Sequence, residues 1–205
     1  MNVRILFKKD AQEALFQGID ELADAVSSTL GPKGHSVIID KGYGVPHITK
    51  DGVTVARAYD TDDTMKRMGA TLVKTVAAKT CDEAGDGTTT ATILTRALIK
   101  HGMEVLPNVK NPQQFKQGME AAKSEAVKFM QVMAKEIGEE DFDRVRQIAT
   151  ISSNGDEEVG CIITEAIGKV GNDGVITVEE SSKGNETTVE VTTGFQWEKG
   201  LVNPY

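Results

Sequence analysis

The sequence predicts a mainly α-helical chain with one small β hairpin, followed by a small α/β segment. Through most of residues 1–136, apolar residues recur every three or four positions, which is the spacing of one helical face. Two β-branched runs flank a glycine-containing turn at residues 42–44, as in a hairpin. After residue 138, two further helical patterns precede two short β-branched runs.

Composition narrows the classes of function. A chain of 205 residues corresponds to one or two domains at about 150 residues each. The net charge of −8 makes nucleic acid and membrane surfaces poor partners. Cys81 and Cys161 lie 80 residues apart, which excludes a disulfide scaffold or zinc ribbon and fits a reducing compartment. We expect no signal peptide, no membrane span and a cytoplasmic location, with an organelle matrix as the alternative.

The first helix is predicted from Asp10, which has Glu13 at capping-box spacing. One apolar face then follows at helical steps, and Gly31-Pro32 ends the helix. That face consists of Leu15, Ile19, Leu22, Val26 and Leu30. Residues 37–41 and 45–49 form the predicted hairpin, and Asp51-Gly52 follows as another turn.

Three more helices are predicted before residue 138. The second runs over 64–80, with Met65, Met68, Leu72 and Val76 on one face. The third begins after residues 85–90 and stops at Gly102. The fourth starts at Asn111-Pro112, a good N-cap and first-turn pair, and ends at Gly138. Its predicted buried side is Phe115, Met119, Ala122, Ala126, Met130 and Met133.

Composition shifts at residues 138–141, which predicts a domain boundary there. Helices are expected at 140–149 and 157–170, and strands at 175–179 and 187–193. The second of these helices is expected to turn Val159, Ile162, Ile163, Ala166, Ile167 and Val170 inward. Cys81 and Cys161 are interpreted as small core residues.

Three loops carry atoms suited to phosphate. They are Thr29-Leu30-Gly31-Pro32-Lys33-Gly34, Thr49-Lys50-Asp51-Gly52 and Gly85-Asp86-Gly87-Thr88-Thr89-Thr90. The third opens a helix, where unpaired N–H groups and the positive dipole end favour anions. Asp86 is a hard oxygen ligand suited to Mg²⁺. Each loop can also be interpreted as purely structural: the first as the end of a helix, the second as a β-turn and the third as a helix cap. The sequence contains neither a Walker A loop nor a GxGxxG motif.

Taken together, these motifs resemble the group I, GroEL-type chaperonins over essentially the whole chain. The residues that carry the resemblance are LADAV at 22–26, TLGPKG at 29–34, TKDGV at 49–53, AGDGTTTAT at 84–92, ATIS at 149–152 and GNDGVITVE at 171–179.

The resemblance implies three domains and a function. Residues 1–136 would be the first part of the equatorial domain, 137–193 the first half of the intermediate domain, and 194–205 the start of the apical domain. In the family, the equatorial domain binds ATP with Mg²⁺ and K⁺ and makes most ring contacts. The apical domain binds non-native polypeptides and the co-chaperonin. The implied function is an ATP-dependent protein-folding chaperone subunit, an ATPase of the isomerase class, in homo-oligomeric heptameric rings.

The same resemblance implies residue roles at the nucleotide. Asp86 would ligate Mg²⁺, Lys50 would contact the nucleotide, and Asp51 would be the catalytic residue that helps to position the attacking water. The remaining phosphate-contacting residues would be Thr29, Leu30, Gly31, Pro32, Gly87, Thr88, Thr89 and Thr90.

The chain departs from the family pattern in length, because family chains are more than twice as long. The family's principal hydrolytic aspartate and its adenine and ribose contacts belong to parts that this sequence lacks. Leu201 and Asn203 replace residues that are usually aromatic and serine.

Two alternatives stay open: a truncated chaperonin-like protein that joins or modulates rings without hydrolysing ATP, and an unrelated phosphate-binding protein. On the chaperonin interpretation, we expect exposed apolar helix faces.

Overall fold

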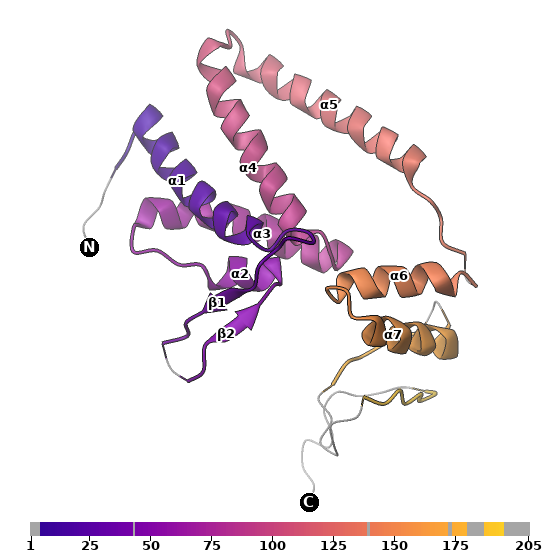
Figure 1. The fold of residues 1–205 in the computed structure, drawn as a ribbon. Coiled ribbons are helices and arrows are strands. Elements are labelled where there is room, and N and C mark those ends of the chain that lie inside the picture. The colour runs from indigo at the N-terminus through magenta and orange to yellow at the C-terminus, as the bar shows by residue number, and fades with distance from the viewer. Residues whose placement is uncertain (1–4, 43, 139, 172–173, 180–186, 195–205) are drawn as a thin grey trace, which may run out of the picture. The chain divides into compact units, whose positions relative to one another are not determined.

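A computed structural model describes residues 5–42, 44–138, 140–171, 174–179 and 187–194 (Figure 1). The chain divides into two compact units, Met1–Phe129 and Met130–Tyr205. The expected domain limits at 136/137 and 193/194 stay a prediction. Residues 195–205, including the departures at Leu201 and Asn203, lie outside the described residues. No helix among those described combines the length and apolarity needed to cross a membrane.

The first unit is built from helices and one small sheet, as predicted. Strands β1 (Val37–Ile39) and β2 (His47–Thr49) pair antiparallel, with Ile38 opposite Ile48. The helices are α1 (Lys8–Ser27), α2 (Gly52–Ala58), α3 (Thr64–Ala84), α4 (Thr88–Val105), the short 3₁₀ helix η1 (Leu106–Asn108) and α5 (Pro112–Met133). The last turn of α5 belongs to the second unit. The mainly helical fold class with a small hairpin is therefore confirmed.

The core of this unit forms where α1 crosses α3. At the crossing, a Cβ added to Gly18 would lie 1.9 Å from the carbonyl oxygen of Lys66, and one added to Gly69 would lie 1.9 Å from that of Leu15. The two backbones therefore touch directly, which only glycine permits. Around this crossing, α1, α2 and α3 bury Ile19, Leu22, Val26, Val53, Val55, Ala56, Ala70, Val73 and Ala77.

The close crossing corrects the predicted face of α3. Because Gly69 must face α1, the residues that turn inward are Ala70, Val73 and Ala77, and Met68 and Leu72 are more than half exposed. Of the four large side chains predicted on one face of this helix, Met68 and Leu72 are therefore not buried, whereas Met65 and Val76 are half-buried. Small residues occupy the buried face because the helices lie too close together for large ones.

The ends of α1 and α4 also differ from the prediction. Helix α1 begins at Lys8, so Asp10 lies in its first turn and is not the cap. It ends at Ser27, which leaves Leu30 outside the helix and 49% exposed. Helix α4 continues through Gly102 to Val105, since one glycine lowers helix stability without ending a helix.

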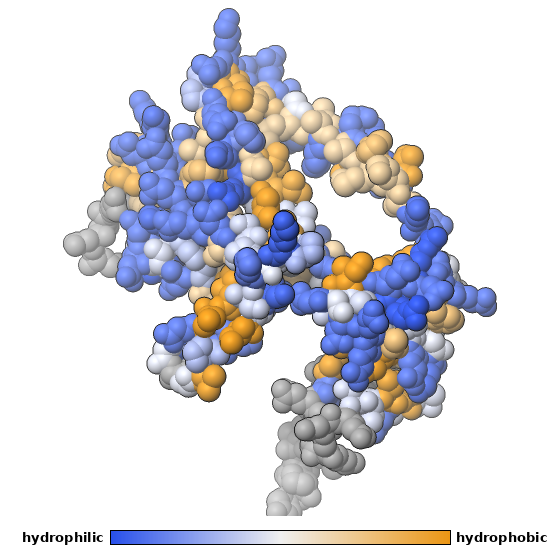
Figure 2. All heavy atoms as spheres, in the orientation of Figure 1, coloured by the Kyte–Doolittle hydropathy of each residue, from blue (hydrophilic) through white to orange (hydrophobic). Residues whose placement is uncertain are grey.

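Helix α5 begins as predicted and packs differently. Asn111 caps it, with its side-chain oxygen accepting hydrogen bonds from the backbone N–H groups of Gln113 and Gln114. Its predicted apolar side is not buried: Phe115 is half-buried, and Met119, Met130 and Met133 are exposed. Apolar atoms are visible on the surface over α4 and α5 in Figure 2. The expectation of exposed apolar helix faces is thus confirmed for these helices.

The second unit contains a pair of packed helices. Helices α6 (Phe142–Ser152) and α7 (Glu157–Val170) confirm the two predicted helices. Ala166 is buried and Ile162, Ile163, Ile167 and Val170 are half-buried, whereas Val159 is 38% exposed. Cys81 packs against the core of the first unit, but Cys161 is exposed, which corrects its interpretation as a core residue.

The two predicted strands after α7 are not formed among the described residues. Residues 174–179 and 187–193 are not paired as β-strands. Residues 180–186 lie outside the described part. A two-stranded ribbon without a third strand or a helix packed against it is marginally stable in water. Their β-branched composition therefore does not suffice to form a sheet here.

We expect Gly18→Ala to lower the free energy of unfolding by about 1–3 kcal/mol, because the added methyl group overpacks the α1–α3 crossing. Gly102→Ala in α4 is the matched control: its Cβ meets nothing within 4 Å, so the gain in helix propensity should stabilise the protein by about 0.5–1 kcal/mol. Chemical denaturation followed by circular dichroism measures both. Equal stability of the two variants would contradict the direct backbone contact.

A polar cluster beside the core gives the fold a pH dependence. Lys66 and the Tyr59 hydroxyl both donate to the Glu21 carboxylate, at 2.5 and 2.8 Å. The hydrogen bond from Lys66, followed by that from Tyr59, holds the pKa of Glu21 below its ordinary value. Burial and the hydrogen bond to Glu21 raise the pKa of Tyr59 to about 12.

We expect Glu21 to make the protein less stable in acid. Because the pKa of Glu21 is lower in the folded protein than in the unfolded chain, its ionised carboxylate stabilises the fold above the ordinary glutamate pKa of 4.5. This stabilisation is lost as the pH falls through the pKa of the folded protein. The midpoint temperature of thermal unfolding should therefore fall less steeply between pH 7 and pH 3 in Glu21→Gln than in the parent chain. Glu13→Gln, on the exposed side of α1, is the control. Parallel curves for the parent and Glu21→Gln would refute the assignment.

Candidate functional site

The three phosphate-type loops of the sequence meet at the N-terminal end of α4. The Thr29 and Thr89 hydroxyl oxygens lie 3.4 Å apart, although 60 residues separate them. A Cβ added to Gly52 would lie 2.1 Å from the Thr89 hydroxyl oxygen and 3.3 Å from that of Thr88. The end of α1, the start of α2 and the start of α4 are therefore in contact at one place.

Helix α4 starts without a side-chain cap. Its N-cap residue Gly87 is left-handed, with φ of 82°, and supplies no capping side chain. By contrast, helices α2, α3, α6 and α7 each begin at an aspartate whose carboxylate accepts first-turn N–H groups. The N-cap residue of α4 thus supplies no carboxylate to the first-turn N–H groups, and a helix start of this kind suits an external anion.

The Gly85-Asp86-Gly87 loop places Asp86 at the same helix end. Gly85 closes α3 in the left-handed conformation, and its N–H donates to the Cys81 carbonyl oxygen at 2.9 Å. The Gly87 N–H donates to the Asp86 carboxylate at 2.6 Å. The Asp86 side chain is exposed and is held beside the helix start by this bond.

The three threonines differ in exposure along the first turn of α4. Thr88 is buried, Thr89 is half-buried and Thr90 is exposed. Thr29 donates its hydroxyl proton to the Val26 carbonyl oxygen at 2.8 Å, so at the 3.4 Å contact Thr89 is the donor. A ligand at this helix end therefore meets the Thr90 hydroxyl more readily than that of Thr88.

The loop after α1 is compact and partly exposed. The His35 N–H donates to the Ser28 carbonyl oxygen at 2.8 Å, and the Gly34 N–H donates to that of Gly31 at 2.9 Å. Gly31 is left-handed, with φ of 71°. Leu30, Gly31 and Pro32 are exposed, so their backbone groups are open to solvent next to the Thr29 anchor.

Asp51 has a structural role that the sequence interpretation missed. Its carboxylate accepts hydrogen bonds from the Val53 N–H at 3.3 Å, the Thr54 N–H at 2.9 Å and the Thr54 hydroxyl at 2.5 Å. It is the N-cap of α2, a helix predicted only as a turn, and an aspartate before a helical apolar pattern was the available signal. Lys50 lies exposed directly before it.

A metal ion at this helix end would need ligands beyond those that the described residues supply. The described residues contain no group of three or more His, Cys, Asp or Glu side chains able to hold a metal. Among the described residues, Asp86 is therefore not part of a cluster of three such side chains. Magnesium is commonly bound this way, through one or two carboxylates together with phosphate oxygens and water.

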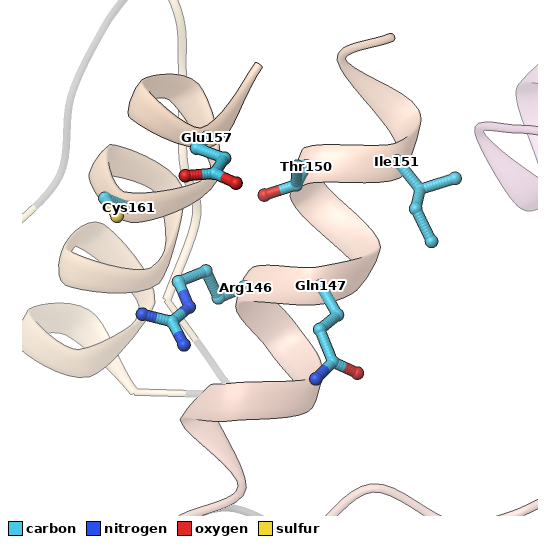
Figure 3. A pocket seen from close by; sticks show the side chains of 6 residues that line it. All are labelled: Arg146, Gln147, Thr150, Ile151, Glu157 and Cys161. Carbon is cyan, nitrogen blue, oxygen red and sulfur yellow. The ribbon is translucent and has the colours of Figure 1, made fainter. Parts of the chain in front are cut away.

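A separate open hollow of about 390 Å³ lies between α6 and α7 in the second unit (Figure 3). None of the phosphate-motif residues lines it. Arg146 is held by Asp143 at 3.2 Å, and Gly160 allows α7 to approach Thr150, whose hydroxyl oxygen would lie 2.1 Å from an added Cβ. The lining residues are Arg146, Gln147, Thr150, Ile151, Glu157 and Cys161. No local pattern in the sequence predicts this hollow.

Comparison with known proteins decides the family. Residues 22–205 match the sequence model of the TCP-1/cpn60 chaperonin family. This chain belongs to that chaperonin family. The match includes residues 22–129 of the first unit, the whole second unit and all three loops at the start of α4.

Solved structures agree with this membership. The chaperonin chain is similar to the chaperonin gp146 from the bacteriophage EL 2 (Pseudomonas aeruginosa), in the presence of ATP-BeFx. In one crystal form the identity is 35% over 77% of this chain and 27% of that chain, with a TM-score of 0.67. In another crystal form it is 34% over 79% and 28%, with a TM-score of 0.69.

A group III chaperonin in the open state is also similar, at 28% identity over 80% of this chain and 32% of that chain, with a TM-score of 0.66. The chaperonin chain thus spans about a quarter to a third of the length of these structures.

Capping and chemistry at Asp51 can be separated by two substitutions. Asp51→Ala should cost about 1 kcal/mol of folding stability because α2 loses its cap, whereas Asp51→Asn should change stability by a few tenths, since asparagine caps equally well. Thermal and chemical unfolding measure both. If Asp51→Asn destabilised the chain as much as Asp51→Ala, the carboxylate charge and not the cap would hold α2.

Proposed function

We propose that this chain is part of an ATP-dependent protein-folding chaperone subunit and binds the phosphates of Mg-ATP at the start of α4. One observation carries the proposal: the three loops meet at a helix end without a side-chain cap, through the Thr29–Thr89 contact and the packing of Gly52 against Thr89. Membership of the chaperonin family supports it independently.

The residues at this helix end fit a magnesium–phosphate group. The N–H groups of Thr88, Thr89 and Thr90 begin α4, so they and the helix dipole favour negative charge there. Gly87 leaves the helix start without a Cβ, and Gly52 lets α2 pack directly against Thr89. When bound, Mg-ATP would supply the phosphate oxygens that complete the coordination of a cation held by Asp86.

Each remaining residue then has a defined role in the proposal. The backbone from Thr29 to Pro32 would contact the phosphates, and Lys50 would supply a positive charge to the nucleotide. Asp51, which caps α2, would help to position the attacking water. Hydrolysis of this kind depends on positioning and electrostatics.

The finer assignment in this proposal is a group I, GroEL-type subunit. Its basis is the series of motifs from residues 22–26 to 171–179. With that assignment go heptameric homo-oligomeric rings, non-native polypeptides and a co-chaperonin as partners, K⁺ as a second cation, and a cytoplasmic location.

A second candidate function is a chaperonin-like interaction protein that modulates rings without hydrolysing ATP. The exposed apolar side chains of α4 and α5, such as Leu94, Leu98 and Phe129, favour it because they are suited to contact with another polypeptide. Phosphate release by the purified chain separates the two: Mg²⁺-dependent turnover supports the ATPase, and its absence together with retained association supports the interaction protein.

We expect Asp86→Asn to weaken Mg-ATP binding about 10- to 100-fold, the equivalent of one charged hydrogen-bonding group. Asp82→Asn, at an exposed carboxylate near the end of α3, is the matched control and should bind as the parent does. Isothermal titration calorimetry with and without Mg²⁺ measures the effect, and the deficit of Asp86→Asn should shrink when Mg²⁺ is left out. Equal affinity of both variants and the parent would refute the site.

A further inference from the structure

Arg96 joins α4 to α1 through two carboxylates. Its Nε lies 2.6 Å from the Asp20 carboxylate, and its Nη1 lies 2.7 Å from that of Asp24. Asp20 and Asp24 are one helical turn apart on α1. The Arg96 side chain is 26% exposed, so most of its length is covered where the two helices meet.

This ion-pair triad lies two turns from the candidate phosphate site. Arg96 follows Thr89 by seven positions on α4, which places both on nearly the same face, about 10.5 Å apart along the axis. Asp24 lies on α1 and precedes Thr29, which follows the end of that helix, by five positions. The chain around the end of α1 is therefore joined to α4 at two points: the hydroxyl contact of Thr29 with Thr89, and the triad between α1 and α4.

The triad constrains geometry more than it adds stability. Asp24 is 64% exposed and Asp20 is 38% exposed, and ion pairs between such exposed groups contribute little to the free energy of folding. A guanidinium is a rigid planar fork, however. Because it engages two carboxylates on successive turns, it opposes both the sliding and the rotation of α1 against α4.

We propose that Arg96 is a positioning residue for the phosphate site. By fixing the register of α1 against α4, it holds the loop that begins at Thr29 against the first turn of α4. Binding sites need such support, because small misplacements of a constellation cost much of its affinity. This inference rests on the proposed function, since it concerns the same site.

The test compares Arg96→Gln and Arg96→Lys with the parent chain, and uses Arg67→Gln as the matched control. Arg67 forms an exposed ion pair with Asp60 at 3.0 Å, which does not link α1 to α4. Arg96→Gln should raise the Kd for Mg-ATP about tenfold, Arg96→Lys should give an intermediate value, and Arg67→Gln should leave it unchanged. Titration calorimetry gives the affinities, and thermal unfolding midpoints should stay close to that of the parent.

A double-mutant cycle separates positioning from general loosening of the fold. If Arg96 acts through the Thr29 loop, Arg96→Gln should cost little further affinity in a Thr29→Val background, so that the two effects are not additive. Fully additive losses, or an Arg96→Gln chain that binds as the parent does, would overturn the inference and leave the proposed site intact. A parent chain with no affinity for Mg-ATP would overturn the proposed function and this inference together.

Discussion

The backbone contact between α1 and α3 is the constraint on which the first unit depends. Gly18 and Gly69 each face a carbonyl of the other helix, so the helix axes come closer than any pair with side chains at these positions would allow. That approach decides which residues of α3 turn inward and seals Leu22, Val26 and Val73 completely. With α1 fixed in this way, its C-terminal end reaches the start of α4, where the candidate phosphate site lies.

Much of the fold follows from local pattern. The hairpin, the cap at Asn111 and the helices α6 and α7 were predictable because turn residues, caps and apolar spacing act over a few neighbours. The face of α3 was not, since Met68 and Leu72 satisfy a helical stripe equally well and only the tertiary contact at Gly69 excludes them. The prediction of strands at 175–179 and 187–193 was wrong for a related reason, because strand formation depends on neighbouring strands as well as on composition.

In the candidate site, too, local pattern predicted the individual loops, and tertiary packing determined how they come together. Each of its three loops was visible in the sequence, because glycine, threonine and aspartate at helix ends have known local roles. Their convergence was not derivable from local pattern, since Thr29, Gly52 and Thr89 meet only through the packing of three helices, and the resemblance supplied that link. The cap formed by Asp51 was missed because a turn and the first residue of a short helix look alike in sequence. Family membership strengthens the phosphate interpretation without assigning each residue its role.

The open apolar surface of α4 and α5 has a consequence for how the purified chain behaves as a colloid. Its side chains attract one another only at contact, whereas the net charge of −8 repels copies across a Debye length of about 10 Å at 0.1 M salt. At low salt concentration, electrostatic repulsion therefore keeps the copies apart. Added salt shortens the range of this repulsion and leaves the short-range attraction between apolar side chains unchanged. Clustering in solution should consequently grow with ionic strength, the opposite of what complexes held together by opposite charges do.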